Sequence, residues 1–335
     1  MRTWEIWRLS DEPAAALRVV DLPPVAPPGP GQVAVDVDAV AVGFPDLLLS
    51  QGQYHEKPEL PFVPGGEGVG TVVAVGKGVP AEVLGRRHVL TRSGALRGLL
   101  SEQVTLDADE LLPVPDAMPD AVAASLFVAY QTAYLALFRR RKGDVQAGET
   151  LLVHGATGGV GSAAVELGKA AGARVIAVVR GAAKVDRARR LGADVVIDSS
   201  AETIEHRVLH ETCGRGVDVV FDPVGGPAFE ASRRCMAVEG RLLVIGFASG
   251  ERAAAPVNHA LVKNYSVIGF RTRPFRLDPA YRRDVHDRLL AHYERGEISP
   301  VVETVGFEAV PSALSRLRDR TTVGRIVVDV RGARR

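Results

Sequence analysis

Cysteine is nearly absent from this chain of 335 residues, which contains Cys213 and Cys235 and no others. Two thiols cannot build the disulfide framework that stabilises small secreted domains. Residues 1–10 also lack the apolar run of a secretory signal. These two features predict a protein of a reducing compartment, and we expect it in the cytoplasm.

Charge of one sign and aromatic side chains are scarce as well. Lys and Arg number 41 against 40 Asp and Glu, and aromatic residues make up 5%. Nucleic-acid surfaces rely on basic excess or on aromatic platforms, so we expect no nucleic-acid partner. No uninterrupted apolar run approaches the ~18 residues of a membrane span, so we expect no membrane partner.

The first third of the chain has the pattern of β structure. A loop rich in proline and glycine, residues 23–31, cannot be helical. It precedes Gln32–Val42, whose first half alternates apolar and polar residues as a half-buried strand does. Further strands are predicted at Gly68–Val75, His88–Thr91 and Glu102–Leu106. Short strands separated by Gly and Pro turns predict a compact, barrel-like β domain.

From residue 120 the pattern changes to alternating helices and strands. After a helix at Asp120–Phe138, strands are predicted at Thr150–His154, Arg174–Val179, Val195–Asp198, Val217–Asp222 and Arg241–Gly246. The helices predicted among them are Val160–Ala171, Ala183–Leu191, Ala201–Thr212 and Pro227–Met236. This alternation predicts a parallel sheet with helices on both faces.

The alternation is expected to end before residue 265. The remaining elements are helices at Pro279–Gly296 and Val310–Arg318 and strands at Val301–Phe307 and Gly324–Val330. Because closing strands need partners, we expect this tail to return to the first domain.

The turn that follows the first strand of the alternation carries the strongest local signal. Residues 154–161 read HGATGGVG and join a strand to a helix. Gly158 lets the backbone approach a pyrophosphate, Gly161 lets the helix pack on the strand, and the helix start offers N–H groups to phosphate. Ala156 stands where the usual fingerprint has its first glycine. Within five alternating strands, the turn predicts a dinucleotide cofactor.

A carboxylate is missing where NAD-binding proteins place one. They carry Asp or Glu about 20 residues beyond the turn, on the ribose 2′-hydroxyl. Here the strand Arg174–Val179 runs into Arg180 and then Lys184. Both cations suit a 2′-phosphate, although they would also be at home on an exposed helix start. The sequence therefore favours NADPH over NADH.

Short motifs occur along nearly the whole chain in the order of one known family. They lie at residues 31–33 (GQV), 44–46 (FPD), 60–65 (LPFVPG), 130–134 (YQTAY), 216–226 (GVDVVFDPVGG) and 324–325 (GR). In them the chain resembles the medium-chain dehydrogenase/reductase superfamily, in particular its zinc-independent quinone oxidoreductase branch. The resemblance implies an α/β fold in which residues 1–122 and 265–335, from both chain ends, form a GroES-like catalytic domain. Residues 123–264 would form a Rossmann domain with a doubly wound parallel sheet, and two chains would pair through it as a homodimer.

Ligands for zinc are missing from the positions where that superfamily carries them. Metal-dependent members have a Cys and a His at the positions that match Gly43 and Gly66, and glycine offers no side-chain ligand. His206 and His210 are four residues apart, but we expect both on a solvated helix face. The sequence therefore predicts no metal, and zinc-assisted alcohol dehydrogenase chemistry is not expected.

The resemblance also implies which residues surround the reacting ring. The branch often has a polarising Asn where this chain has Gly43. Tyr54 matches a family tyrosine and is the candidate donor to the substrate, with a purely structural place in the pocket wall as the alternative. Tyr130 and Thr132 match positions that face the nicotinamide, with packing of their helix as the alternative.

Most cofactor residues implied by the resemblance follow strands of the alternating region. They are Gly158, Gly159, Val160 and Gly161 at the pyrophosphate, Arg180 and Lys184 at the 2′-phosphate, Asp222, Val224 and Gly225 at the ribose, Gly246, Phe247, Ala248 and Phe270 beside the nicotinamide, and Arg320 at the adenine-side phosphate.

The function expected from these features is hydride transfer from NADPH to a quinone, a small-molecule electrophile. Such an acceptor needs orientation and at most a hydrogen-bond donor for its developing negative oxygen. A reductase of enones, alkenals or enoyl thioesters would use the same fold and cofactor. A non-catalytic NADPH-binding protein is a further alternative, which the loss of the Asn at Gly43 would fit.

Overall fold

The computed structural model describes residues 1–92 and 97–334. Contacts between Cα atoms divide the chain into two compact units. The first unit contains Met1–Val128, Arg273–His286 and Pro300–Arg335, and the second contains Ala129–Thr272 and Asp287–Ser299. The division falls inside the long helix α3, Asp120–Phe138. Both ends of the chain therefore belong to the first unit.

The first unit is built on a mostly antiparallel sheet. Its described strands are ordered β14-β15-β3-β4-β5-β7, and β6 pairs with β3. These strands are β3 Gln32–Val42, β4 Glu67–Val75, β5 Arg87–Thr91, β6 Gln103–Asp107, β7 Leu111–Pro113, β14 Val302–Gly306 and β15 Arg325–Asp329. The four strands predicted in the first third of the sequence are confirmed to within one residue at each end.

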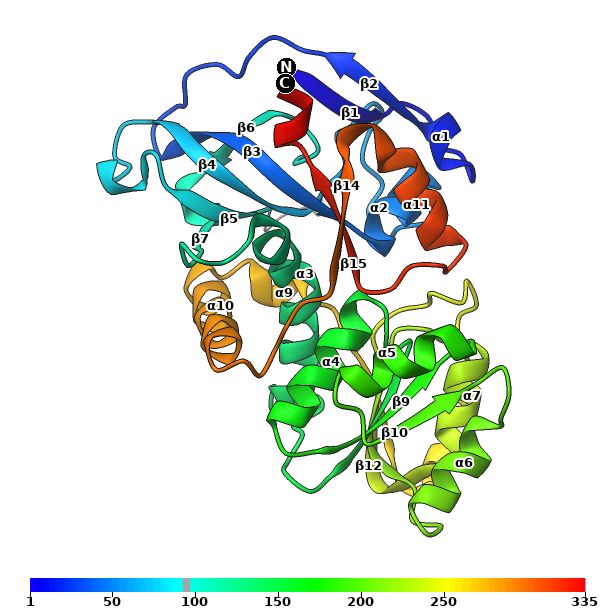
Figure 1. Cartoon of the computed structure of the whole chain (residues 1–335). Coiled ribbons are helices and arrows are strands. Elements are labelled where there is room, and N and C mark those ends of the chain that lie inside the picture. Colours follow the sequence, from blue (N-terminus) through cyan, green and yellow to red (C-terminus); the bar gives the residue numbers. More distant parts are fainter. Residues whose placement is uncertain (93–96, 335) are drawn as a thin grey trace. The chain divides into compact units, whose positions relative to one another are not determined.

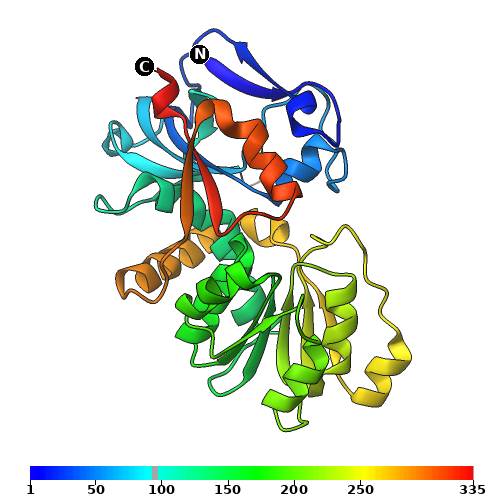
Figure 2. The ribbon, with the colours of Figure 1, turned by 45° about the vertical axis from the view of Figure 1, so that its right-hand side comes forward.

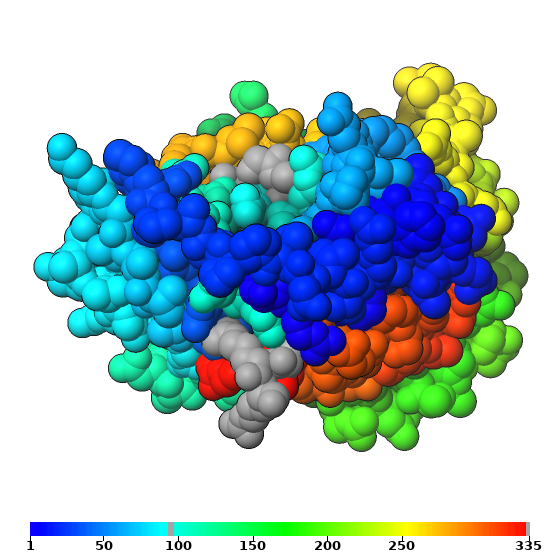
Figure 3. Space-filling view, turned by 90° about the horizontal axis from the view of Figure 1, so that it is seen from above, coloured from blue at the N-terminus to red at the C-terminus, as the bar shows by residue number. Residues whose placement is uncertain are grey.

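Helices and a separate two-stranded ribbon complete the first unit. The ribbon pairs β1 Arg2–Ile6 with β2 Leu17–Asp21. The helical elements are α1 Pro13–Ala16, α2 Phe44–Ser50, η1 Ala81–Val83, η2 Ala108–Glu110, α9 Arg273–Arg276, η4 Phe307–Ala309, α11 Val310–Arg318 and η5 Arg331–Arg334. Figure 3 shows the N-terminal residues, in dark blue, beside the orange segment with α11, in agreement with the contacts between α1 and α11.

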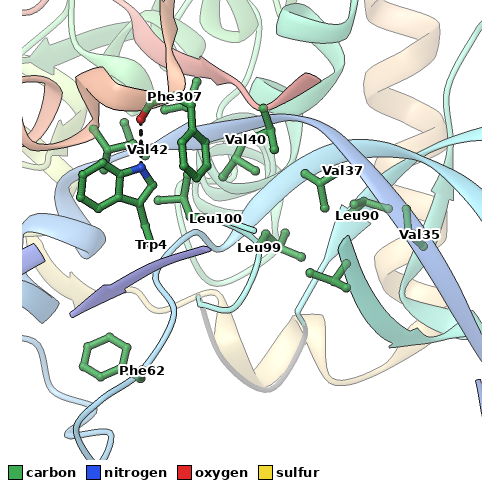
Figure 4. Packing of buried hydrophobic residues seen from close by; sticks show 14 of the residues in the cluster. Trp4, Val35, Val37, Val40, Val42, Phe62, Leu90, Leu99, Leu100 and Phe307 are labelled. Carbon is green, nitrogen blue, oxygen red and sulfur yellow. Dashed lines mark hydrogen bonds between the residues drawn. The ribbon is translucent and has the colours of Figure 1, made fainter. Parts of the chain in front are cut away.

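The core of the first unit joins residues from both chain ends to β3. Alternate residues of β3 are fully buried, and Figure 4 shows Val35 and Val37 among the residues of one apolar cluster. In the same cluster the indole Nε1 of Trp4 donates a hydrogen bond of 2.9 Å to the carbonyl oxygen of Phe307. The predicted return of the C-terminal tail is confirmed, because β15 pairs with β3 and β14 pairs with β15.

The second unit is a doubly wound parallel sheet, with strand order β10-β9-β8-β11-β12-β13. Figures 1 and 2 show helices on both of its faces. The strands are β8 Thr150–His154, β9 Arg174–Val179, β10 Val195–Asp198, β11 Val217–Asp222, β12 Met236–Val244 and β13 Ser266–Gly269. The helical elements are α4 Gly159–Ala170, η3 Ala182–Lys184, α5 Val185–Arg190, α6 Ile204–Glu211, α7 Pro227–Arg234 and α8 Val257–Lys263. The predicted parallel sheet is confirmed.

The alternation extends further along the chain than the sequence indicated. We expected it to end before residue 265, yet β13 pairs in parallel with β12 as a sixth strand. This strand has four residues at the sheet edge and is largely exposed, so it lacks the apolar run that marked the others. In addition, residues 287–299, with the second half of α10 Pro279–Glu294, group with the second unit. The expected division at residue 265 is therefore wrong at these two segments.

Helix α3 is apolar along its whole length. Among the described residues, it is the one helix with the length and hydropathy of a membrane span. The structure buries 67% of that span inside the protein, as expected for the core helix of a soluble fold.

Candidate functional site

The turn between β8 and α4 has space for glycine and for no larger residue. A Cβ at Gly161 would lie 2.1 Å from the carbonyl oxygen of Gly155, far inside contact distance. Gly155 itself has a φ of 57°, a left-handed conformation that favours glycine. The first turn of α4 leaves N–H groups without intrahelical acceptors, and residues 158–160 are partly exposed. The turn thus has the form of a phosphate-binding site.

The turn lies where the strand order of the sheet reverses. β8 stands between β9 and β11, so the connections that leave β8 and β11 run to opposite sides. Ligands of such sheets bind at this point, beyond the carboxyl ends of the strands. The loops after β8 and β11 meet there, because a Cβ at Gly155 would lie 3.4 Å from Cγ2 of Val224.

Asp222 ends β11 beside this turn and carries an unused acceptor. Its side chain is 1% exposed, and its Oδ1 accepts hydrogen bonds from the backbone N–H groups of Val224 at 2.8 Å and Gly225 at 2.9 Å. Its Oδ2 is buried and has no partner among the described residues. Leaving a buried acceptor unpaired costs about 1–3 kcal/mol, which a ligand hydroxyl would relieve. A ribose of a dinucleotide supplies such a hydroxyl, so the site fits this part of the cofactor.

Two cations follow the neighbouring strand β9. Arg180 is exposed at the strand end, and Lys184 lies half-buried in η3. Burial lowers the pKa of Lys184. The nearest carboxylate of the adjacent strand, Asp198, accepts hydrogen bonds from the backbone of Gly181 and from Ser200. Its acceptors serve these loops, so the edge presents cations and suits a phosphate.

The other residues expected beside the nicotinamide lie at the same edge of the sheet. Gly246, Phe247 and Ala248 follow β12, and Ala248 donates its N–H to the carbonyl of Pro223 at 3.0 Å. Phe270 follows β13 directly. The structure therefore brings together all the expected cofactor residues of the second unit, because parallel strands end on one side.

Tyr130 has a different environment from the one we expected. It is 1% exposed, and its hydroxyl donates a hydrogen bond of 2.6 Å to Oε2 of Glu166. The other oxygen of Glu166 accepts from the backbone N–H of Ser299 at 3.1 Å. Burial and the charge of Glu166 raise the pKa of Tyr130 well above its ordinary value. This geometry favours the packing alternative for Tyr130, while Thr132 remains partly exposed on α3.

Gly43, Tyr54 and Arg320 belong to the first unit. Gly43 is the residue before α2, and Tyr54 follows this helix, with its backbone N–H bonded to the carbonyl of Leu48 at 3.1 Å. The ring of Tyr54 packs against the core of the first unit, 4.0 Å from the ring of His55. Arg320 is exposed in a turn, with a φ of 56°. The packing of Tyr54 supports its place in a wall, and its role as donor stays a prediction.

The positions that match zinc ligands surround an internal ion pair. Gly43 and Gly66 are buried, and beside them the guanidinium of Arg325 donates Nη2–H to Oε1 of Glu67. Within residues 1–92 and 97–334, the structure has no group of three or more His, Cys, Asp and Glu side chains arranged to hold a metal. The two histidines of α6, at 206 and 210, are exposed. Sequence reasoning marked Arg325 only as part of a closing motif, since its partner lies 258 residues away.

A GroES-like β unit joined to a doubly wound dinucleotide-binding unit is the architecture of medium-chain dehydrogenases and reductases. The family model described as alcohol dehydrogenase GroES-like domain matches residues 29–116, and the one described as zinc-binding dehydrogenase matches residues 159–279. Quinone oxidoreductase-like protein 2 homolog of Nematostella vectensis is 35% identical over 307 residues, covering 90% of this chain and 83% of that protein. Prostaglandin reductase-3 of Bos taurus is 33% identical over 325 residues, covering 92% and 83%.

A solved structure agrees with these sequence matches. The Escherichia coli quinone oxidoreductase complexed with NADPH superimposes with a TM-score of 0.90 at 28% identity, covering 98% of this chain and 100% of that one. The chain belongs to the medium-chain dehydrogenase/reductase superfamily, in its zinc-independent quinone oxidoreductase branch.

The glycine turn gives the first testable prediction. Gly161→Ala would place a Cβ 2.1 Å from the Gly155 carbonyl oxygen and push α4 away from the turn. Strain of about 1–3 kcal/mol is expected, which corresponds to a rise in the Kd for NADPH of about tenfold or more. Fluorescence titration of NADPH measures the change. Gly306→Ala is the control, because a Cβ at Gly306 meets nothing within 4 Å and should leave binding unchanged.

Proposed function

We propose that this protein is a metal-independent reductase that transfers hydride from NADPH to a quinone. The observation that carries the proposal is the glycine turn at the strand-order reversal, flanked by the unused oxygen of Asp222 and by the cations after β9. A solved member of the same branch is a quinone oxidoreductase complexed with NADPH, which supports both the cofactor and the acceptor.

Each part of the site has a distinct task in this reaction. Bound NADPH supplies the hydride, and the protein positions the cofactor and acceptor. The turn residues Gly158–Gly161 hold the pyrophosphate, Arg180 and Lys184 the 2′-phosphate, and Asp222 a ribose hydroxyl. Gly43, Tyr54, Thr132 and the segments after β12 and β13 would surround the nicotinamide and the acceptor. A quinone is already electrophilic, so orientation supplies much of the rate enhancement.

Reduction of an enone, alkenal or enoyl thioester is the second candidate. Prostaglandin reductase-3, by its name a reductase, is 33% identical to this chain. The same hydride donor would serve both kinds of acceptor, so the choice depends on the acceptor pocket.

A turnover assay tests the proposed function. The protein, purified without added metal, is mixed with NADPH and in turn with benzoquinone, naphthoquinone, an alkenal and an enoyl thioester. We expect NADPH absorbance to fall with at least one quinone, at the same rate with and without a chelator. Faster oxidation with the alkenal or thioester would favour the second candidate. NADPH binding without turnover of any acceptor would contradict both and would point to a non-catalytic NADPH-binding protein.

Cofactor choice gives a separate prediction. Arg180→Ala combined with Lys184→Ala should raise the Kd for NADPH by about tenfold or more, since each charged hydrogen bond to phosphate contributes about 1.5–3 kcal/mol. The Kd for NADH should stay unchanged, because NADH lacks the 2′-phosphate. Arg190→Ala, another exposed arginine on α5, is the matched control. Equal loss of both cofactors would contradict the assignment.

We also propose that the protein works in the cytoplasm as a homodimer formed through the second unit. Both cysteines are free thiols, which supports a reducing compartment. β13 lies at the sheet edge and can accept a further strand. On the preceding helix α8, Val257 and Leu261 are each 81% exposed and Val262 is 82% exposed. Apolar side chains of this size next to a sheet edge support an interface with a second copy.

The dimer is tested with a charge on α8. Leu261→Asp would bury a carboxylate in the interface, so we expect a monomer in light scattering coupled to gel filtration. Leu84→Asp, at an exposed leucine of the first unit, should leave the mass unchanged. A monomeric wild-type protein would contradict the proposal.

A further inference from the structure

A small cavity in the first unit adjoins the ion pair of Arg325 and Glu67. It has a volume of ≈ 10 Å³, and its lining includes Gly43, Asp46, Gly66, Glu67 and Arg325. That volume is about what one water molecule needs. The cavity thus has room for a single oxygen atom, and a guanidinium forms part of its wall.

The walls of the cavity are held rigidly by Asp46. Its Oδ2 accepts the backbone N–H of Gly43 at 2.8 Å, and its Oδ1 accepts that of Gly65 at 2.9 Å. Both oxygens of this carboxylate are therefore engaged, on opposite sides of the cavity. Glu67 is similarly engaged, since its Oε2 accepts the N–H of Val128 at 2.6 Å while Oε1 accepts from Arg325.

Arg325 has donors that the protein does not use. Its side chain is 10% exposed, and Nη2 is committed to Glu67. Nε is buried without a partner, and Nη1 makes no hydrogen bond to any residue that the structure describes. A guanidinium has five N–H donors in a fixed plane, so the free donors keep their direction once Nη2 is bound.

Gly43 is what allows Nη1 to reach this place. A Cβ at residue 43 would lie 2.5 Å from Nη1, which is too close for any side chain. The absence of a side chain at Gly43 and the forward position of Arg325 therefore require each other. The Asn that the branch often carries at this position could not coexist with the guanidinium as it stands.

We propose that Arg325 is a catalytic residue whose Nη1–H binds the carbonyl oxygen of the acceptor and stabilises the negative charge that develops there. This inference rests on the proposed reductase function and supplies the hydrogen-bond donor that Gly43 does not provide. A fixed donor aimed at a developing oxyanion is among the strongest contributions to catalysis.

The proposed step balances as follows for an enone. The β-carbon of the acceptor gains a hydride, with its two electrons, from NADPH, which becomes NADP⁺. The C=C π electrons move to the adjacent bond, and the C=O π electrons move onto oxygen, giving an enolate. Arg325 holds this oxyanion without losing its own proton, and a proton from water then completes the product. In a quinone the same oxygen becomes that of the hydroquinone monoanion.

The decisive experiment compares acceptors of different electrophilicity. Arg325→Met alone leaves Glu67 buried without a cation, which can prevent folding. The double variant Arg325→Met with Glu67→Gln removes both charges together. Removing one oxyanion donor costs roughly 100-fold in kcat, so we expect that loss with an enone and a much smaller loss with benzoquinone, which needs less polarisation. The Kd for NADPH should change less than about twofold, well under the tenfold that corresponds to 1.4 kcal/mol.

Two further variants separate catalysis from structure. Gly43→Ala keeps both charges and should lower turnover of the enone by displacing Nη1, with kcat affected more than KM. Arg331→Met also removes an arginine from a buried carboxylate of the first unit, Asp38, but away from the cavity. It should leave the ratio of enone to benzoquinone turnover unchanged. Equal losses for all acceptors, or a matching loss of ratio in Arg331→Met, would overturn the proposal.

A binding measurement keeps the inference separable from the proposed function. 4-Nitrophenol, added with NADP⁺, reports the ionisation of its own oxygen by colour. Wild type should bind the phenolate and shift its ionisation to lower pH, and the double variant should lose this shift. If wild type reduces no acceptor but retains this Arg325-dependent shift, the reductase function fails while the oxyanion site stands. If wild type reduces acceptors and shows no shift, Arg325 has no such role.

Discussion

A carboxylate that is withdrawn from water needs a cation and hydrogen-bond donors, and this requirement organises the first unit. Glu67, at the start of β4, is 1% exposed. Burial raises its pKa, and the charge of Arg325 acts in the opposite direction. Arg325 begins β15, and the N–H of Val128 in α3 reaches the other oxygen. Three segments far apart in the sequence are therefore tied to one carboxylate, and the C-terminal tail must return to the sheet for Glu67 to be paired.

The same ion pair stands where metal-dependent relatives would need ligands. With Gly43 and Gly66 in place of a Cys and a His, the space between β3 and β4 takes a guanidinium that is part of the chain. This arrangement suits an acceptor that is already electrophilic, since one fixed donor can stabilise its negative oxygen without a metal. The chemistry of the second unit is complementary, because its glycine turn and cations are arranged to hold phosphates.

Particular residues show why parts of the site were predictable. The turn at 154–161 and the cations Arg180 and Lys184 were recognisable because spacing along one strand–turn–helix unit determines where they lie. Tyr130 was assigned to the nicotinamide from its motif, whereas its hydroxyl bonds to Glu166, 36 residues further along. β13 was missed because a short edge strand is exposed and carries no apolar alternation.

The sequence by itself determined the elements whose signal is local. Apolar periodicity set the strands and helices, and glycine spacing set the cofactor turn, because both depend on residues within a few positions of each other. Only the tertiary structure decided which distant side chains meet: Arg325 with Glu67, Tyr130 with Glu166, and the unused oxygen of Asp222 with the turn after β8. Such contacts depend on how strands and loops pack, and a single sequence does not encode them at any fixed spacing.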